Sequence, residues 1–437
     1  MRMAYTVKDI LRAEVKPALG CTEPVAVALG AAAAASLLPG GRIDSIEVWV
    51  DPNTFKNGLV VSIPGTKGLS GLDLAAALGA IGGDPRLGLE VLRPVDEGVV
   101  RRARELLARG AVKIHLFAEP GLHIRTVLVG GGRRAESVIR GFHDRIVRLA
   151  LDGRELRDSP LLSDSRKEDA VNSLEGWLRG LSLEELLRLL GDLDEEDLEF
   201  LELGIVYNLR LAKYGLEHGP GLGVGKALER LAREGILKKD MVLQAKIITS
   251  AAADARMAGV KLPAMASAGS GNHGLTAVLP IWAVKDFIGC EHRRILEAIC
   301  LSHLVTAYIK AHTGRLSAVC GCSVAAGSGA AAGVAYLMGG DLQEIASAIN
   351  NLIGDLAGVI CDGAKESCAL KVGTAAGTAV QAALLATRGI SVRPNCGLIG
   401  ERVEETVEGL GLLSREGMRE ADPVVLRIIR ARYPFVR

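Results

Sequence analysis

The sequence predicts an α+β protein with a large all-helical domain and a smaller α/β module. Two observations lead to this fold class. Between about residues 41 and 155, segments with strand-like alternation take turns with helical segments. After about residue 155, nearly every segment has helical periodicity. Aromatic residues make up only 3% of a chain that is 49% hydrophobic, which favours closely packed helices of Ala, Leu, Val and Ile.

The first third of the chain contains both kinds of element. Thr6 caps a helical stretch that reaches Leu38 and is interrupted at Pro17 and at the turn 20–24. We expect strands at 43–50, 58–63, 88–92, 112–118 and 123–129. We expect helices at 71–81, 96–109 and 135–151.

The remainder is predicted to be helical, with a capped helix that begins at Ser182 and another at 192–214. The longest apolar runs, 25–38 and 324–338, consist mostly of Ala, Gly and Val. They are less hydrophobic than the roughly 20 strongly apolar residues of a membrane span, so we expect buried core helices and no membrane partner.

Composition favours a small-molecule function. The 52 Lys and Arg balance the 51 Asp and Glu, so no excess charge points to nucleic acid or to an anionic membrane. No signal peptide is visible before Thr6, and we expect a cytoplasmic protein. In that compartment the eight cysteines suit thiolate chemistry or metal binding better than disulfides.

The segment from Cys361 to Cys368 is the most informative motif. On an unbroken helix these two sulfurs would share a face but stand about 10 Å apart along the axis. Asp362 and Gly363 break that helix, so we expect a loop folded back on itself. Such a loop brings both sulfurs to one metal centre.

A second pair, Cys320 and Cys322, comes where another helix is expected to start, which favours a thiolate. Residues two apart point to different sides of a helix, so we prefer Cys322 as a ligand, with Cys320 as the alternative. Three cysteines on a four-iron cluster leave one iron open as a Lewis acid. Zinc with three thiolates competes, and so does a structural role as small buried side chains.

Two further motifs carry polar groups. The glycine-rich stretch 268–274 places Asn272 and His273 side by side, as a cradle for a substrate carboxylate or as a plain turn. Cys21 lies in a glycine-to-proline turn with a carboxylate close in sequence, as a reactive thiol, a base, a ligand or a buried turn residue.

Other polar residues offer substrate contacts or are simply surface groups. They are Lys56, Asn57, His303, Lys310 and His312.

Together these motifs resemble the L-cysteine desulfidase family, which is similar to the α-chain domain of iron–sulfur L-serine dehydratases. The likeness covers essentially the whole chain. The resemblance implies that the arm 1–40 joins 156–437 in one helical domain, with 41–155 inserted as the α/β module. It also implies a homodimer.

The same resemblance implies a [4Fe–4S] cluster bound by Cys361, Cys368 and one of Cys320 and Cys322, with one iron free of protein ligands. Cys21 would be the catalytic base, and no pyridoxal phosphate would be needed. Substrate would contact Asn272, His273, Lys56 and Asn57.

The serine dehydratases carry Cys-Asp-Pro and a longer gap to the next cysteine, whereas this chain has Cys-Asp-Gly and a shorter gap. That departure favours L-cysteine over L-serine as the small-molecule substrate. The expected reaction is β-elimination to pyruvate, ammonia and sulfide. The alternatives are an L-serine dehydratase and a non-catalytic iron–sulfur redox sensor.

Overall fold

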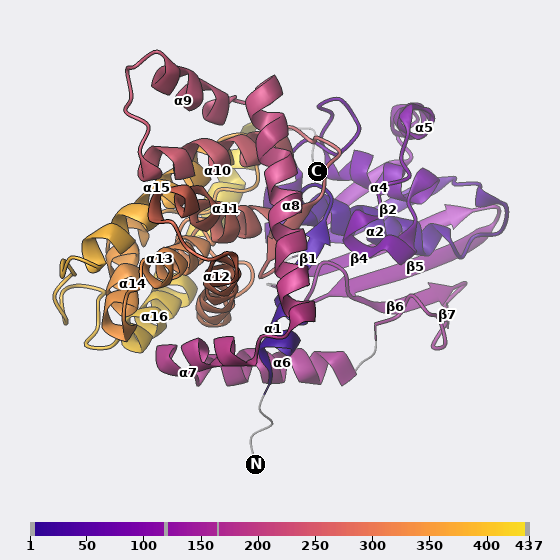
Figure 1. The fold of residues 1–437 in the computed structure, drawn as a ribbon. Coiled ribbons are helices and arrows are strands. Elements are labelled where there is room, and N and C mark those ends of the chain that lie inside the picture. The colour runs from indigo at the N-terminus through magenta and orange to yellow at the C-terminus, as the bar shows by residue number, and fades with distance from the viewer. Residues whose placement is uncertain (1–4, 118–120, 164–165, 433–437) are drawn as a thin grey trace.

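A computed structural model describes residues 5–117, 121–163 and 166–432, with no side-chain description for 166–172. Its architecture is a helical domain beside an α/β module, as the sequence predicts (Figure 1). Residues 1–4, 118–120, 164–165 and 433–437 are not described, so the outer ends of the predicted helical domain and the last residue of the strand predicted at 112–118 lie outside the described residues.

The α/β module is built on one mixed sheet with the strand order β3-β2-β4-β5-β6-β7. Its strands are β2 (Ser45–Val50), β3 (Val112–Leu116), β4 (His123–Gly130), β5 (Arg133–Arg140), β6 (Ile146–Leu151) and β7 (Arg154–Glu155). Only the β2–β3 pair is parallel, and the other neighbours are antiparallel. The strands predicted at 43–50 and 123–129 are confirmed.

Two helices, α2 (Thr22–Ala35) and α4 (Leu72–Gly82), pack against this sheet. Helix α3 (Pro52–Gly58) packs against α2, and α5 (Glu97–Ala108) packs against α4. The module also contains the 3₁₀ turns η1 (Pro39–Gly41) and η2 (Pro85–Glu90). The helices expected at 71–81 and 96–109 are therefore confirmed as α4 and α5. Asp96 caps α5 by accepting a hydrogen bond from the Val99 backbone.

Three predicted elements of the module are wrong. The helix expected at 135–151 is the hairpin β5–β6, since β-branched Val138, Ile139 and Ile146 fit a pleated sheet and Gly141 turns the chain at φ +79°. The strand expected at 58–63 follows α3, and only Ser62 makes an isolated bridge there.

The strand expected at 88–92 is also wrong, because it is mostly the end of η2. The backbone of Gly88 has φ +54° inside that turn, which is incompatible with an extended strand.

The helical domain contains the remaining elements. In order they are α1 (Val7–Glu14), α6 (Arg166–Arg179), α7 (Leu183–Arg188), η3 (Leu189–Asp192), α8 (Glu195–His218), α9 (Val224–Arg233), α10 (Met241–Met257), α11 (Gly271–Ile288), α12 (His292–Thr313), α13 (Ala325–Leu337), α14 (Leu342–Leu356), α15 (Cys368–Ala386), α16 (Val403–Leu412), the π-turn η4 (Leu413–Gly417) and α17 (Ala421–Arg432). The capping residues Thr6 and Ser182 form capping boxes with Asp9 and Glu185, as expected of helix starts.

The N-terminal arm is divided between the two cores. Helix α1 packs with the helical domain, and β1 (Val15–Ala18) pairs antiparallel with β8 (Ala264–Ser267). Helix α2 instead packs between the sheet and α4, where nearly all of its side chains are buried. The predicted division put all of 1–40 with the helical domain, so the position of α2 differs from it. The reason is that a helix of Ala, Gly and Val has no polar face and must be covered all round.

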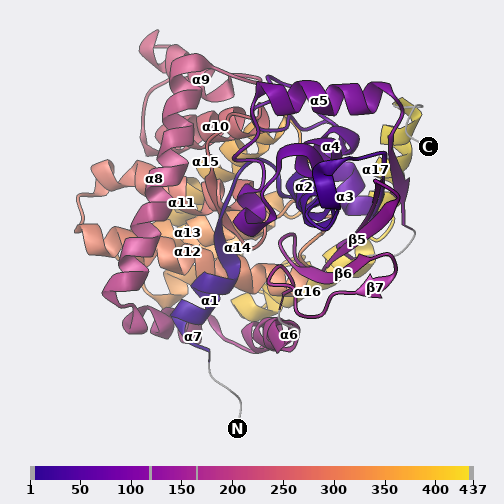
Figure 2. The same cartoon turned by 90° about the vertical axis from the view of Figure 1, so that its right-hand side faces the viewer.

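The C-terminal helix also crosses to the module. Figure 2 shows α17 beside α3, and Leu426 of α17 joins the hydrophobic core of the module. This crossing brings Asp422, at the start of α17, to the boundary between the two parts.

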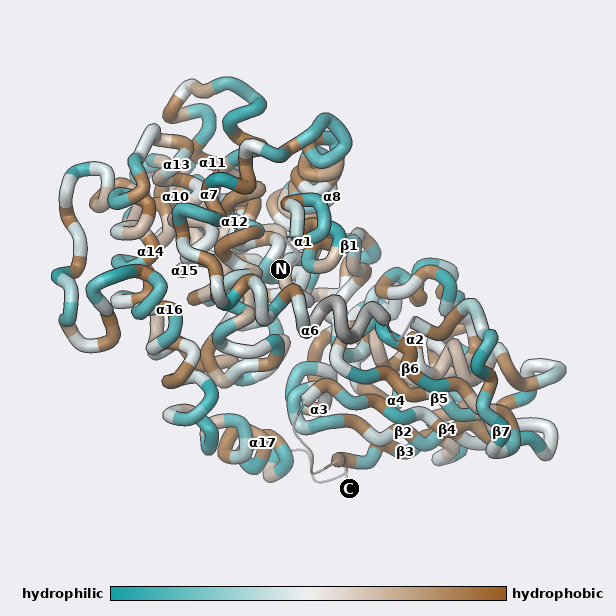
Figure 3. The backbone as a smooth tube through the Cα atoms, turned by 90° about the horizontal axis from the view of Figure 1, so that it is seen from below, coloured by the Kyte–Doolittle hydropathy of each residue, from teal (hydrophilic) through white to brown (hydrophobic). Residues whose placement is uncertain are grey.

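The apolar runs predicted as core helices are α2 and α13, and both are buried. Among the described residues, one helix, α15, is long and apolar enough to cross a membrane by length and composition. Its most apolar window is 56% buried inside the protein, and α10, α13 and α14 pack against it. Many core helices pass the same test, so it is weak support for a span. Figure 3 shows apolar segments inside both parts of the molecule.

Candidate active site

A cavity of about 580 Å³ is lined by residues of the helical domain and of the α/β module. The residues expected to act as base, to contact the substrate in the family resemblance or to bind the cluster all line it, together with the alternative ligand. These residues are Cys21, Lys56, Asn57, Asn272, His273, Cys320, Cys322, Cys361 and Cys368. Five separate stretches of the chain therefore meet in one place.

The two cysteine motifs are joined by backbone pairing. Val319 and Ile360 form an antiparallel bridge, so Cys320 N–H donates to Val359 O at 2.8 Å and Cys361 N–H donates to Ala318 O at 2.7 Å. Helix α13 starts at Ala325, just after the first motif. Residues about forty positions apart in the sequence are thus held side by side.

The stretch from Cys361 to Cys368 is a loop, as predicted. Gly363 has φ +101°, and a side chain there would lie 2.5 Å from the Lys56 carbonyl. Cys368 is the first residue of α15, and its thiol faces back to Gly363 O at 3.7 Å. The Asp362 carboxylate binds Lys365 and Lys371, which closes the loop.

The thiols of the two motifs influence one another. A hydrogen bond from Cys322, helped by Ser323, lowers the pKa of Cys320 to about 5, and the same bond raises the pKa of Cys322. Burial raises the pKa of Cys361, and it raises that of Cys368 to about 12. The shared hydrogen bond therefore favours a single negative charge on the pair. Among the described residues, no three His, Cys, Asp or Glu side chains are arranged to hold a single metal ion.

Cys21 occupies the N-cap position of α2 without a side-chain capping hydrogen bond, and it is 4% exposed. Gly20 before it has φ +86°, and a side chain there would collide with Pro64. The thiol donates to Glu23 Oε2 at 3.0 Å. Burial and the Glu23 carboxylate raise the pKa of Cys21, so the resting group is a thiol. A catalytic base works best with a pKa near the working pH, so this raised pKa does not favour Cys21 as a base in the resting site.

Asn272 and His273 lie in the first turn of α11. Arg256 Nη1 donates to Asn272 Oδ1 at 2.9 Å, which leaves the amide NH₂ as the free donor of Asn272 apart from a weak contact to Met257 sulfur. Asn272 is thus oriented as a hydrogen-bond donor, as a carboxylate cradle requires.

His273 does not have the role expected of it in a cradle for a substrate carboxylate. Nδ1 donates to Ser267 O at 3.1 Å, because a carbonyl only accepts, and Nε2 keeps its lone pair. Burial and Lys310 lower the pKa of His273 to about 3, so the ring is neutral. A neutral ring with a free Nε2 accepts hydrogen bonds and cannot hold a carboxylate.

Lys56 and Asn57 are both buried in α3. Lys56 Nζ donates to Cys361 O at 3.1 Å and forms an ion pair of 2.5 Å with Asp422. Its charge is therefore already partnered within the protein. Its contacts tie the module to the Cys361 loop and to α17.

Three candidates lie in α12, namely His303, Lys310 and His312. All three are buried, so the surface interpretation is wrong for them. Lys310 lines the cavity and donates to Ser317 Oγ at 3.0 Å, while burial lowers its pKa to about 8. His303 Nδ1 contacts Ser267 Oγ at 2.9 Å, and His312 lies outside the cavity lining.

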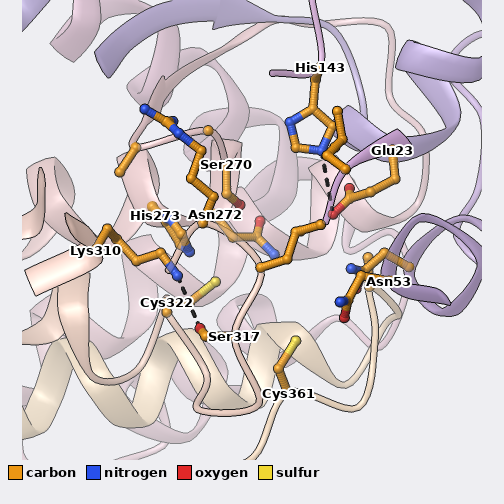
Figure 4. A pocket seen from close by; sticks show the side chains of 18 of the residues that line it. Glu23, Asn53, His143, Ser270, Asn272, His273, Lys310, Ser317, Cys322 and Cys361 are labelled. Carbon is orange, nitrogen blue, oxygen red and sulfur yellow. Dashed lines mark hydrogen bonds and ion pairs between the residues drawn. The ribbon is translucent and has the colours of Figure 1, made fainter. Parts of the chain in front are cut away.

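The sequence analysis gave no role to three residues that shape the cavity. Arg256 is 2% exposed, Glu23 accepts from Cys21, and His143 enters from the loop between β5 and β6 (Figure 4). An arginine within the Ala-rich stretch 251–257 was a visible signal, since a lone charge among small apolar residues is rarely buried without a task. His143 had no comparable signal.

Known proteins match this chain over more than half of its length or nearly all of it. The family model for the serine dehydratase alpha chain matches residues 184–427, which is more than half of the chain. A UPF0597 protein of Desulfotalea psychrophila is 57% identical over 99% of both chains, and one of Desulfatibacillum aliphaticivorans is 59% identical over 98% of both. A UPF0597 protein of Clostridioides difficile is 44% identical over 96% of this chain and 98% of its own length. The chain belongs to the UPF0597 family, which is related to the serine dehydratase α chain.

Proposed function

We propose that this protein is an L-cysteine desulfidase, a carbon–sulfur lyase that converts L-cysteine and water to pyruvate, ammonia and sulfide. One observation carries the proposal: the Cys21 thiol, the Asn272 amide and the thiols of both cysteine motifs line a single cavity. Relationship to the serine dehydratase α chain supports a lyase of this kind. A cytoplasmic homodimer is part of the proposal.

The donor set suits an iron–sulfur cluster. Cys361, Cys368 and Cys322, with Cys320 as the alternative, would hold it, since cysteine thiolates are the usual ligands of such clusters. Lys371 interacts electrostatically with Cys320 and Cys368, which favours thiolates in this place. When bound, a [4Fe–4S] cluster with one iron free of protein ligands supplies a Lewis acid. Pyridoxal phosphate has no role in this proposal.

The chain's own residues would handle the protons. Cys21 passes its proton to Glu23, to which it is hydrogen-bonded, and the thiolate then removes the substrate α-proton. The Cα–H electrons form the Cα=Cβ bond, the Cβ–S bond breaks, and sulfide leaves. The aminoacrylate tautomerises and hydrolyses to pyruvate and ammonia. The pair Cys21–Glu23 holds one proton and one negative charge throughout the first transfer.

Substrate contacts follow from the hydrogen-bonding roles of the lining residues. The Asn272 amide donates to the substrate carboxylate, and His273 Nε2 accepts from a donor group on the substrate. Lys56 and Asn57 border the same space from the module, where Lys56 also holds the Cys361 loop.

L-serine dehydratase is the second candidate, and the family match over residues 184–427 favours it specifically. Its elimination would release water in place of sulfide, with the same proton chemistry. A redox sensor is less well supported, because a sensor has no need for oriented donors such as Asn272 beside its thiols.

The decisive experiment is a product assay on protein purified without oxygen and reconstituted with iron and sulfide. Sulfide and pyruvate are measured from L-cysteine, and pyruvate from L-serine. We expect equal amounts of sulfide and pyruvate from L-cysteine. Pyruvate from L-serine alone would establish the dehydratase. Turnover of neither amino acid would favour the sensor, and dependence on added pyridoxal phosphate would contradict the mechanism.

A further inference from the structure

Lys310 is a buried cation without a carboxylate partner among the described residues, and the acidic groups that act on its charge are the thiols of Cys361, Cys322 and Cys320. Lys310 is 4% exposed and donates to the Ser317 hydroxyl, and no carboxylate of the described residues forms an ion pair with it. Holding a charge in this position is costly unless a counterion reaches it. Since Lys310 lines the cavity, an anionic group of a ligand is well placed to supply that counterion.

Glu23 is the matching feature across the cavity. Figure 4 shows Lys310 and Ser317 on one side and Glu23 and His143 on the other. Glu23 Oε2 accepts from Cys21 and Thr22, each at 3.0 Å. Its Oε1 lies 4.0 Å from His143 Nε2, a buried nitrogen without a hydrogen-bond partner among the described residues. Oε1 is therefore available to a donor from the cavity.

We infer that the cavity binds its substrate as a zwitterion, with the carboxylate on Lys310 and the ammonium on Glu23 while the proton is still on Cys21. This inference rests on the proposed function and specifies its substrate class as free α-amino acids. Peptides, esters and amides lose one of the two charges and are rejected. The Asn272 amide then supports the carboxylate contact. Lys310 and Glu23 fix which way round the amino acid lies, and so decide which substituent faces the thiols.

The test uses three probes that lack one feature each. L-alanine has both charges and no leaving group, 3-mercaptopropionate lacks the amine, and cysteamine lacks the carboxylate. Binding to the reconstituted, oxygen-free protein is measured by calorimetry for the wild type, Lys310→Met and Glu23→Gln. Lys16→Met is the matched control, because Lys16 also lines the cavity but pairs with Asp144 at 2.8 Å.

We expect Lys310→Met to weaken binding of L-alanine and 3-mercaptopropionate at least about tenfold, and that of cysteamine by less than about twofold. Glu23→Gln should do the reverse, weakening L-alanine and cysteamine but not 3-mercaptopropionate. Lys16→Met should change none of them. Lys310→Arg keeps the charge and should bind the three probes in the same order of affinity as the wild type. This variant keeps the inference testable if the Lys310→Met protein fails to fold.

Two results distinguish failure of this inference from failure of the proposed function. In the first, the wild type binds L-alanine, and Lys310→Met either weakens binding of all three probes equally or weakens none of them. Lys310 would then serve the thiols, and the inference would be overturned while the proposed function stands. If the wild type binds no probe and turns over neither L-cysteine nor L-serine, the proposed function is overturned, and this inference with it.

Discussion

Arg256 Nη1 donates a hydrogen bond of 2.9 Å to Asn272 Oδ1, and the same guanidinium reaches Gly20 O through Nη2 at 2.7 Å. One buried side chain thus ties the turn that carries Cys21 to the first turn of α11. The two motifs lie about 250 residues apart in the chain, and Arg256 fixes the direction in which the Asn272 amide donates. It acts as a positioning residue for both.

We expect Arg256→Gln to lower the free energy of unfolding by about 2 kcal/mol, because hydrogen bonds from a charged donor to buried acceptors are lost. KM should rise more than kcat falls, since Asn272 loses its fixed orientation. Urea unfolding and steady-state kinetics measure the two effects. Arg230→Gln on the exposed face of α9 is the control. A normal KM in a destabilised Arg256→Gln protein would limit Arg256 to folding.

The position of the His273 ring leaves room only for a glycine at position 321. A Cβ atom at this position would lie 2.4 Å from His273 Nε2, which is too close for any side chain. We expect Gly321→Ala to cost about 1–3 kcal/mol of stability by overpacking and to reduce turnover well beyond that loss, because the ring must move. Gly358→Ala, where a Cβ meets nothing within 4 Å, is the control. Equal activity in both variants would show that His273 has room to shift.

The effect of replacing a cysteine should depend on whether its thiol lines the cavity. Cys361→Ser and Cys368→Ser should lose iron and acid-labile sulfide after oxygen-free reconstitution, since both thiols line the cavity. Cys396→Ser should retain them, because Cys396 is exposed and lies outside the cavity lining. Comparing Cys320→Ser with Cys322→Ser then identifies the third ligand. Full cluster content in both Cys361→Ser and Cys368→Ser would exclude the proposed site.

Local chemistry made part of this site predictable. The loop between Cys361 and Cys368 follows from Asp362 and Gly363, which cannot continue a helix, and no distant residue is needed to see it. The helix caps Thr6 and Ser182 are equally local.

Contacts between distant segments made the rest unpredictable. The pairing of β1 with β8 places an extended strand at Pro17, where the sequence indicates only an interrupted helix. The spacing of Ala135, Ile139 and Ile146 suits a helix face, but pairing with β4 makes β5 a strand. The buried position of Arg256 likewise depends on Gly20, from the other end of the chain.

Asp254 gives the fold a component of stability that depends on pH. Its Oδ2 accepts from Gly225 N–H at 3.0 Å, while Oδ1 is buried without a partner among the described residues. Burial raises the pKa of Asp254 to about 6, above the value of about 3.9 for an unfolded chain. The folded protein therefore binds the proton more tightly. The stabilisation that this tighter proton binding at Asp254 gives the folded state is fully present below about pH 4 and is lost as the pH rises through about 6.

Asp254→Asn should remove this component, because an amide keeps the acceptor for Gly225 and cannot ionise. Urea unfolding at about pH 4.5 and pH 7 should show the wild type losing stability relative to Asp254→Asn as the pH rises. Asp355→Asn, at an exposed position of α14, controls for the loss of a carboxylate elsewhere. If the difference between wild type and Asp254→Asn were the same at both pH values, Asp254 would not titrate in this range, and its unpartnered Oδ1 would have to be satisfied in another way.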